Sequence, residues 1–147
     1  MGWVKEITGG YSLPQFLFHA ALCCFAMART SKDRKYISTA RSCVKLLKTW
    51  AKKGCPNFPH NILLLEAEDK DLRKQRTKAA SSYEKSIKVA KDLKRLQDEA
   101  IANEKYAAFQ RRRGNMDAAN VYLEESIRLY RRWGASKKVE QLLSMMQ

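Results

Sequence analysis

The chain has 147 residues, of which 45% are hydrophobic, and it carries a formal net charge of +14. This length is typical of one domain, and the hydrophobic fraction excludes a disordered chain. Six glycines and three prolines are too few for a loop-rich fold. Long stretches of Ala, Lys, Arg, Glu and Leu favour helix, and no segment alternates like a strand. We therefore predict a single all-α domain over residues 1–147.

The first predicted helix begins near Pro14, which suits a first helical turn, and it reaches Arg29. Its apolar run, residues 16–28, is too short to span a bilayer, which needs about 20 apolar residues. The run also has features of a signal peptide. We favour a buried first helix and leave a role as a signal segment open. A second helix is opened by "TSKD" and ends at Gly54.

Five further helices are predicted in the rest of the chain from periodicity and from start and stop residues. They run from about His60 to Leu72, from about Lys74 to Arg95, from Gln97 to Arg113, from Asn115 to Trp133, and from Ser136 to the end of the chain. The last of these is expected to act as a closing helix over residues 136–147.

The second, fourth and sixth predicted helices superimpose when the sequence is shifted by forty residues. The aligned positions are Thr39 with Ala79 and Ala119, Leu46 with Ser86 and Ser126, Leu47 with Ile87 and Ile127, and Trp50 with Ala90 and Tyr130. A single helix pair cannot bury its apolar face, whereas three stacked pairs share one core. We therefore predict an α-solenoid with helix pairs at 13–53, 56–95 and 96–133, and equivalent buried positions for Leu47, Ile87 and Ile127.

The stretch "GNMDAANVYLEESIRLY", residues 114–130, resembles the second half of a tetratricopeptide repeat. In that family a Gly-Asn or Gly-Asp turn precedes a small residue at the helix–helix contact. The usual period of the family is about 34 residues. A period of forty implies longer helices, as in extended variants of the fold.

A further resemblance covers residues 18–143. The residues that carry it are Trp50, Cys55, Pro56, Asn57, Phe58, Glu66, Ala67, Glu68, Tyr130, Trp133, Gly134, Ala135, Lys138 and Val139. They are similar to a helical-repeat region of very large signalling proteins. In those proteins the region lies between an AAA-type ATPase module with a kinase-like domain and downstream GAF, PAS or histidine-kinase modules. The resemblance implies an intracellular, cytoplasmic signalling role, with the chemistry in other modules.

No enzymatic motif is found in the sequence. There is no phosphate-binding GxxxxGK[ST] loop, no kinase signature and no G-x-S-x-G elbow. The four cysteines form no CxxC pair, and the two histidines, His19 and His60, do not complete a zinc site. We therefore predict no enzyme, no metal and no cofactor.

Two groups of reactive side chains receive structural interpretations. Cys23, Cys24 and Cys43 lie in apolar helical surroundings, where a free thiol acts as a small core residue, and His19 is interpreted as a core residue as well. The acidic stretch "EAEDKD", residues 66–71, is interpreted as a solvated helix face, with Glu66 and Lys70 in the supporting i, i+4 order.

Basic residues recur near the ends of the second, fourth and sixth predicted helices. We expect them to form one surface, made of Lys52, Lys53, Lys91, Lys94, Arg95, Arg131 and Arg132. Such a surface attracts acidic protein segments, anionic lipid or nucleic acid. The aromatic residues fall mostly on the packing stripe, which disfavours base stacking and hence nucleic-acid readout.

The function expected from these observations is a non-catalytic protein-interaction or scaffold segment in intracellular signalling, with an acidic segment or a neighbouring signalling domain as partner. The chain would be the repeat region of a multidomain ATPase/kinase, a fragment of it, or a relative. Two alternatives stay open: a basic-surface binder of RNA, DNA or anionic membrane, and part of a signalling enzyme whose catalytic module is absent from this chain. The oligomeric state is also open.

Overall fold

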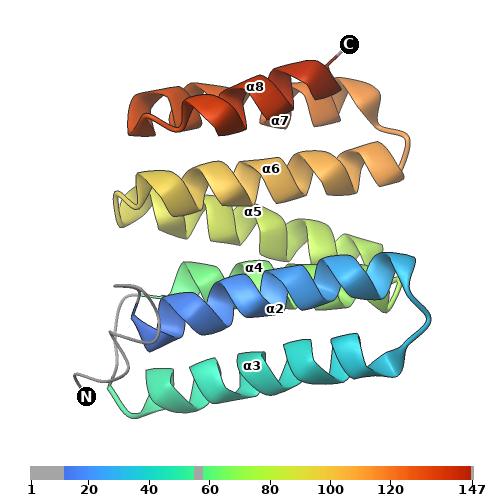
Figure 1. Cartoon of the computed structure of the whole chain (residues 1–147), viewed down its shortest axis with the longest axis vertical. Coiled ribbons are helices and arrows are strands. Elements are labelled where there is room, and N and C mark those ends of the chain that lie inside the picture. Colours follow the sequence, from blue (N-terminus) through green and yellow to red (C-terminus); the bar gives the residue numbers. More distant parts are fainter. Residues whose placement is uncertain (1–11, 55–57, 147) are drawn as a thin grey trace. The chain divides into compact units, whose positions relative to one another are not determined.

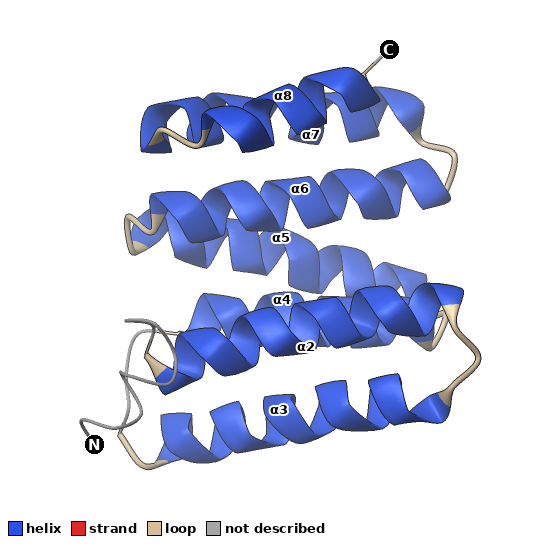
Figure 2. Ribbon diagram, in the orientation of Figure 1, coloured by secondary structure: helices blue, strands red, loops and turns tan. Residues whose placement is uncertain are grey.

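The structure, a computed structural model, describes residues 12–54 and 58–146. Every regular element in these residues is an α-helix and none is a strand (Figures 1 and 2), so the all-α prediction is confirmed. Cys55, Pro56 and Asn57, which carry part of the family resemblance, lie outside the described residues. The chain divides into two compact units, residues 1–79 and 80–147, and each is described by itself. The prediction of one domain stays a prediction.

The described helices match the predicted ones closely. Unit 1 contains α2 (Leu13–Thr30), α3 (Arg34–Lys52) and α4 (Pro59–Leu72). Unit 2 contains most of α5 (Arg76–Asp92), then α6 (Leu96–Arg112), α7 (Met116–Trp133) and α8 (Ser136–Met145). Each predicted start and end falls within about three residues of the observed one.

From α3 to α7, consecutive helices end about twenty residues apart. Among the described residues, those with a left-handed backbone are Gly54, Lys74, Lys94, Gly114 and Gly134. After each of the last four, the next residue donates its N–H to the carbonyl five residues earlier, at 2.9–3.0 Å: Gln75 to Lys70, Arg95 to Ala90, Asn115 to Gln110, and Ala135 to Tyr130. This is the Schellman arrangement, which satisfies carbonyls at a helix end. Two such helix-plus-turn segments make the forty-residue period found in the sequence.

In unit 1, α2 and α3 form a helical hairpin and α4 packs on both (Figure 1). Ser12 and Gln15 form a capping box at the start of α2, and Pro14 lies in its first turn. The predicted buried first helix is confirmed, because α2 buries Phe18, Ala21, Leu22 and Phe25. Leu47 of α3 and Leu64 and Leu65 of α4 add to the buried side chains of this unit.

The acidic residues of α4 are not a solvated face, and this prediction is wrong. Glu68 is buried and pairs with Arg29 of α2, which also contacts Asp71 at 2.5 Å. On the α3 side, Arg41 contacts Asp69 at 3.0 Å. The positive charge of α2 and α3 is thus partly neutralised inside unit 1, where the opposite charges join α4 to its neighbours.

A further ion pair joins α4 to α3, with Lys48 lying 3.8 Å from Glu66.

The structure agrees only in part with the interpretation of the cysteines as core residues. Cys43 of α3 is buried, as expected, and burial raises the pKa of its thiol. Cys24 is half-buried and Cys23 is exposed, so Cys23 is not a core residue. His19 is half-buried, with its ring 5.2 Å from that of Phe18.

In unit 2, α6 is buried on nearly all sides, including three consecutive residues at Ala100, Ile101 and Ala102. An aromatic cluster joins it to its neighbours. The ring of Tyr106 lies 5.3 Å from that of Tyr83 on α5 and 4.4 Å from that of Tyr122 on α7. Since α7 packs along α6 and α8 packs on α7, the cluster lies inside a continuous helical stack within this unit.

The burial expected at the aligned repeat positions agrees with the structure better in α5 and α7 than in α3. Ala79 and Ala119 are buried, as are Ser86 and Ser126, and the Ser126 hydroxyl donates to the Ala100 carbonyl at 2.8 Å. Leu47 and Ile127 are buried, whereas Ile87 is half-buried. Thr39 and Leu46, the α3 members of two sets, are exposed, so their predicted equivalence is wrong.

Candidate functional site

The basic residues of unit 2 gather at one end of its helices. Figure 1 shows the α5–α6 turn and the α7–α8 turn on the same side of this unit. We call this surface the basic end, and it consists of Lys91, Lys94, Arg95, Arg131 and Arg132, all exposed. The structure therefore brings together five of the seven predicted residues. Lys52 and Lys53 are exposed at the end of α3 in unit 1.

Two carboxylates lie among these cations, and the sequence interpretation missed both. Lys91 and Arg132 each act electrostatically on Glu99, near the start of α6, and on Glu125 of α7. Lys91 and Arg132 lie at the ends of α5 and α7, and the turns that follow these two helices are on the same side of unit 2 (Figure 1). The basic end is therefore a surface of mixed charge with a positive excess.

The pKa values of Glu99 and Glu125 are shifted in opposite directions. Burial and repulsion from Glu125 raise the pKa of Glu99, although Lys91, Arg128 and Arg132 oppose the shift. Hydrogen bonds from Arg128, at 2.9 Å from Nε and 2.5 Å from Nη2, lower the pKa of Glu125. Arg128 belongs to the same charge cluster, but the forty-residue alignment gave no reason to include it.

Exposed apolar side chains lie beside the cations. Leu93 is 41% exposed in the α5–α6 turn, and Trp133 is 50% exposed at the end of α7. Trp133 is an exception to the prediction that the aromatic residues fall mostly on the packing stripe, whereas Tyr83 and Tyr130 are buried. A hollow of about 330 Å³ opens next to it, lined by Arg131, Gly134, Ser136, Val139 and Glu140. The basic end thus offers positive charge, an aromatic ring and a hollow together.

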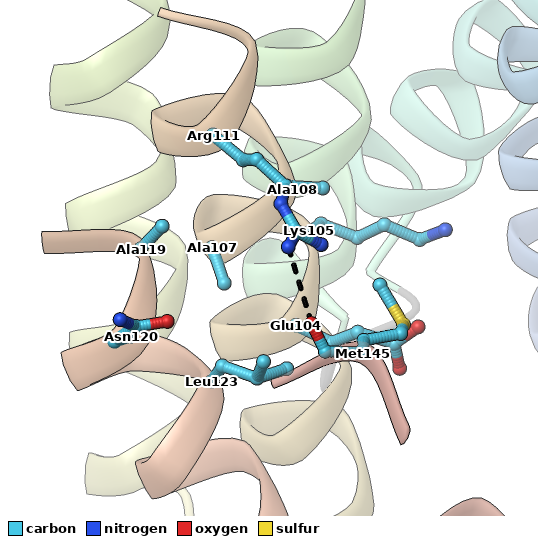
Figure 3. A pocket seen from close by; sticks show the side chains of 9 residues that line it. All are labelled: Glu104, Lys105, Ala107, Ala108, Arg111, Ala119, Asn120, Leu123 and Met145. Atoms are coloured by element: carbon cyan, nitrogen blue, oxygen red, sulfur yellow. Dashed lines mark hydrogen bonds between the residues drawn. The ribbon is translucent and has the colours of Figure 1, made fainter. Parts of the chain in front are cut away.

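A second concave feature lies where α6, α7 and α8 meet (Figure 3). It has a volume of about 70 Å³, and small side chains, Ala107, Ala108 and Ala119, leave the space open. Arg111 reaches across it and donates a hydrogen bond to the carbonyl of Met145 at 3.1 Å. The C-terminal end of α8 is therefore held at the edge of this hollow by a cation of α6.

Glu104 of α6 holds the beginning of α8. Its carboxylate accepts a hydrogen bond from the Tyr130 hydroxyl at 2.9 Å and one from the Lys138 ammonium at 3.0 Å. Burial, together with the nearby Glu104 charge, raises the pKa of Tyr130, so this phenol stays protonated and remains a donor. Glu104 thus ties α6 to α7 and to α8 at once.

In residues 12–54 and 58–146, no three His, Cys, Asp or Glu side chains are grouped so that they could hold a metal ion. Nor does any described helix have both the length and the apolar character needed to cross a bilayer.

Comparison with protein-family models, with curated proteins and with solved structures finds no match for the chain.

Proposed function

We propose that the chain is a non-catalytic, tetratricopeptide-like scaffold segment whose basic end binds an acidic segment of a partner protein. The observation that supports the proposal is the position of Lys91 and Arg132, exposed cations at the ends of two helices, which both act electrostatically on Glu99 and Glu125. Such a cluster attracts acidic chains and speeds their association.

The regular helix ends support the repeat part of the proposal. Four Schellman turns spaced by twenty residues indicate that helix-plus-turn segments of one length follow each other along the chain. Repeated segments of this kind stack to build extended binding surfaces in α-solenoids. With the resemblance to the repeat region of multidomain ATPase/kinase signalling proteins, they favour a cytoplasmic signalling scaffold.

The interleaved carboxylates favour a protein partner over nucleic acid. A nucleic-acid strand presents closely and regularly spaced phosphates, and its binding depends on uninterrupted cationic contacts. Glu125, which is half-buried beside the cations, would meet those phosphates with like charge. An acidic peptide has fewer and separated carboxylates, and its apolar residues can contact Leu93 and Trp133.

A second candidate function rests on Trp133. This exposed ring follows Arg131 and Arg132 directly, and single-stranded nucleic acids bind where aromatic rings for base stacking lie beside cations. A binder of single-stranded RNA or DNA is therefore the alternative that the experiment must separate from the scaffold.

The experiment compares three fluorescent ligands at about 150 mM salt, where charges more than about 8 Å apart are largely screened. The ligands are an acidic peptide containing Leu and Phe, a single-stranded RNA and a double-stranded DNA. The scaffold is expected to bind the peptide and to hold both nucleic acids at least tenfold more weakly. Reversing Arg131 and Arg132 to Glu should abolish peptide binding.

The matched control reverses Lys85 and Lys88 on the exposed surface of α5, which changes the net charge equally. It should leave peptide binding within about twofold, since neither lysine belongs to the basic end. Sub-micromolar binding of RNA, lost on reversal of Arg131 and Arg132, would replace the scaffold with the alternative. Equal loss in both double variants would show that the attraction depends on net charge alone.

A further inference from the structure

The helix α8 is the least buried helix of unit 2. Of its ten residues only Val139 and Leu142 are buried, whereas α7 buries six of eighteen, among them Leu123, Ile127 and Tyr130. A ten-residue helix is too short to be stable by itself in water. The position of α8 therefore depends on its contacts with α6 and α7.

The polar contacts of α8 lie near its two ends. Near its start, Lys138 binds Glu104 at 3.0 Å and lies 5.9 Å from the centre of the Tyr130 ring. At its end, the Met145 carbonyl accepts a hydrogen bond from Arg111 at 3.1 Å. The first hollow, of about 330 Å³, touches its beginning, and the second, of about 70 Å³, touches its end. Two polar anchors and the two buried side chains, Val139 and Leu142, therefore hold α8 between the hollows.

We propose that the face beneath α8 is a docking site for an amphipathic helix of a partner protein, which competes with α8 for it. We call this face the α8 seat, and it consists of Glu104 and Arg111 of α6 with Leu123 and Tyr130 of α7. The seat shares no residue with the basic end. It selects a helix with a cation, whereas the basic end selects an acidic segment.

The seat specifies the chemistry of its occupant. Glu104 is largely buried, with 17% of its side chain exposed, so an occupant without a cation would leave this carboxylate poorly compensated. The occupant therefore needs Lys or Arg directly before the first of two apolar residues spaced by three, as in Lys138, Val139 and Leu142. Its last carbonyls would face Arg111, which complements the negative end of a helix.

The seat can be tested with a labelled peptide of residues 135–146 added to the full chain. In the wild-type chain its own α8 competes, whereas Lys138→Glu places a repelling charge against Glu104 and weakens that competitor. We expect the peptide to bind the K138E chain at least tenfold more tightly than wild type, by fluorescence anisotropy. The matched control is Lys137→Glu, at an exposed neighbour, and it should behave like wild type.

A charge exchange tests whether Glu104 is the recognition group. A peptide carrying Lys138→Glu should not bind the K138E chain but should bind a Glu104→Lys chain, whose own Lys138 is then repelled. Far-UV circular dichroism establishes that each variant is folded. Hydrogen exchange of the wild-type chain adds a measurement without substitution: the α8 amides should exchange at least tenfold faster than those in the middle of α7.

Three results would overturn the proposal. Equal peptide affinity for wild type, K137E and K138E would show that α8 does not cover a docking site. Equal protection of α8 and the middle of α7 would show that α8 does not leave. A concentration-dependent wild-type dimer that K138E dissolves would show that the occupant is the α8 of a second copy and not a partner helix.

Discussion

Lys94 and Gly134 end α5 and α7 in the same left-handed conformation, with φ of +57° and +92°. Forty residues separate them, and the residue after each donates the same hydrogen bond to a carbonyl five positions back. Glycine adopts this conformation freely, whereas in other L-residues it brings Cβ close to the following carbonyl and costs about 1–2 kcal/mol. The fold therefore keeps the turn even where the favoured residue is missing.

Replacing Lys94 by Gly should consequently stabilise the chain. Removing Cβ relieves the backbone strain, and the greater freedom of glycine in the unfolded state offsets part of the gain, which leaves about 0.5–1 kcal/mol. Urea denaturation measures the change. Lys74→Gly, at φ +62° in a different turn, should give a gain of the same sign. A loss in both variants would contradict the strain argument.

The reverse change at Gly134 should destabilise the chain. A Cβ built there meets no atom within 4 Å, so steric contact contributes nothing and only the backbone conformation matters. We expect Gly134→Ala to cost about 1–2 kcal/mol in the free energy of unfolding. An unchanged urea midpoint would show that the α7–α8 turn rearranges without cost.

The ion pairs of Arg29 provide a test in unit 1. Arg29→Ala removes a cation from the buried Glu68 and from Asp71, and breaking a buried pair costs about 3–5 kcal/mol because a charge is left undercompensated. Thermal denaturation followed by circular dichroism should show a large fall in Tm. The control is Lys35→Ala, which removes an exposed contact 3.7 Å from Asp33 and should cost at most about 1 kcal/mol. Similar losses in the two variants would mean that burial of Glu68 does not decide the effect.

Helix positions were predictable because their signals are local. Pro14 at the start of α2 and Gly134 at the end of α7 act through their own backbone, and the structure places both as expected. Burial of a helix face depends instead on which helices lie next to it. Thr39 shares its alignment position with Ala79 and Ala119 and is nevertheless exposed, because α3 buries a narrower face than α7.

The candidate site was predictable only in part for the same reason. The forty-residue spacing predicted that Lys91, Arg131 and Arg132 would lie at one end of the repeat. The carboxylates among them come from other helix faces, and no spacing rule indicates them. The pairing of Glu68 with Arg29 joins residues 39 positions apart, and this contact requires the packing of α4 on α2.

The repeat alignment predicts a large effect at Ile127. This side chain is buried in α7, and its truncation to Ala should cost about 2–5 kcal/mol through lost burial and the cavity left behind. Ile87, at the aligned position of α5, is half-buried, so its truncation should cost less. Val121→Ala on the exposed face of α7 is the control and should stay within about 0.5 kcal/mol. A larger loss at Ile87 than at Ile127 in urea denaturation would contradict the assigned burial.

Glu99 and Glu125, which lie beside the basic end, should make the stability of the fold depend on pH in opposite ways. The pKa of Glu99 is raised above its ordinary value, so the folded state holds this proton more tightly than the unfolded state does. Ionised Glu99 therefore lowers stability once the pH rises through its folded-state pKa, and the penalty persists at neutral pH. The pKa of Glu125 is lowered, so its charge adds stability above the unfolded-state pKa, which is lost as the pH falls through the folded-state value.

Glu99→Gln should thus raise Tm at pH 7, because the amide fills similar space without the charge that burial and Glu125 disfavour. The gain should disappear near pH 3, below the ordinary glutamate pKa of about 4.3, where Glu99 is protonated in both states. Glu125→Gln should lower Tm at pH 7, because Arg128 loses its ionised partner, and the loss should shrink as the pH falls. Thermal melts of both variants and the wild type from pH 3 to 7 measure the two trends. Shifts of the same sign at pH 7 would contradict the assignment of opposite roles to the two carboxylates.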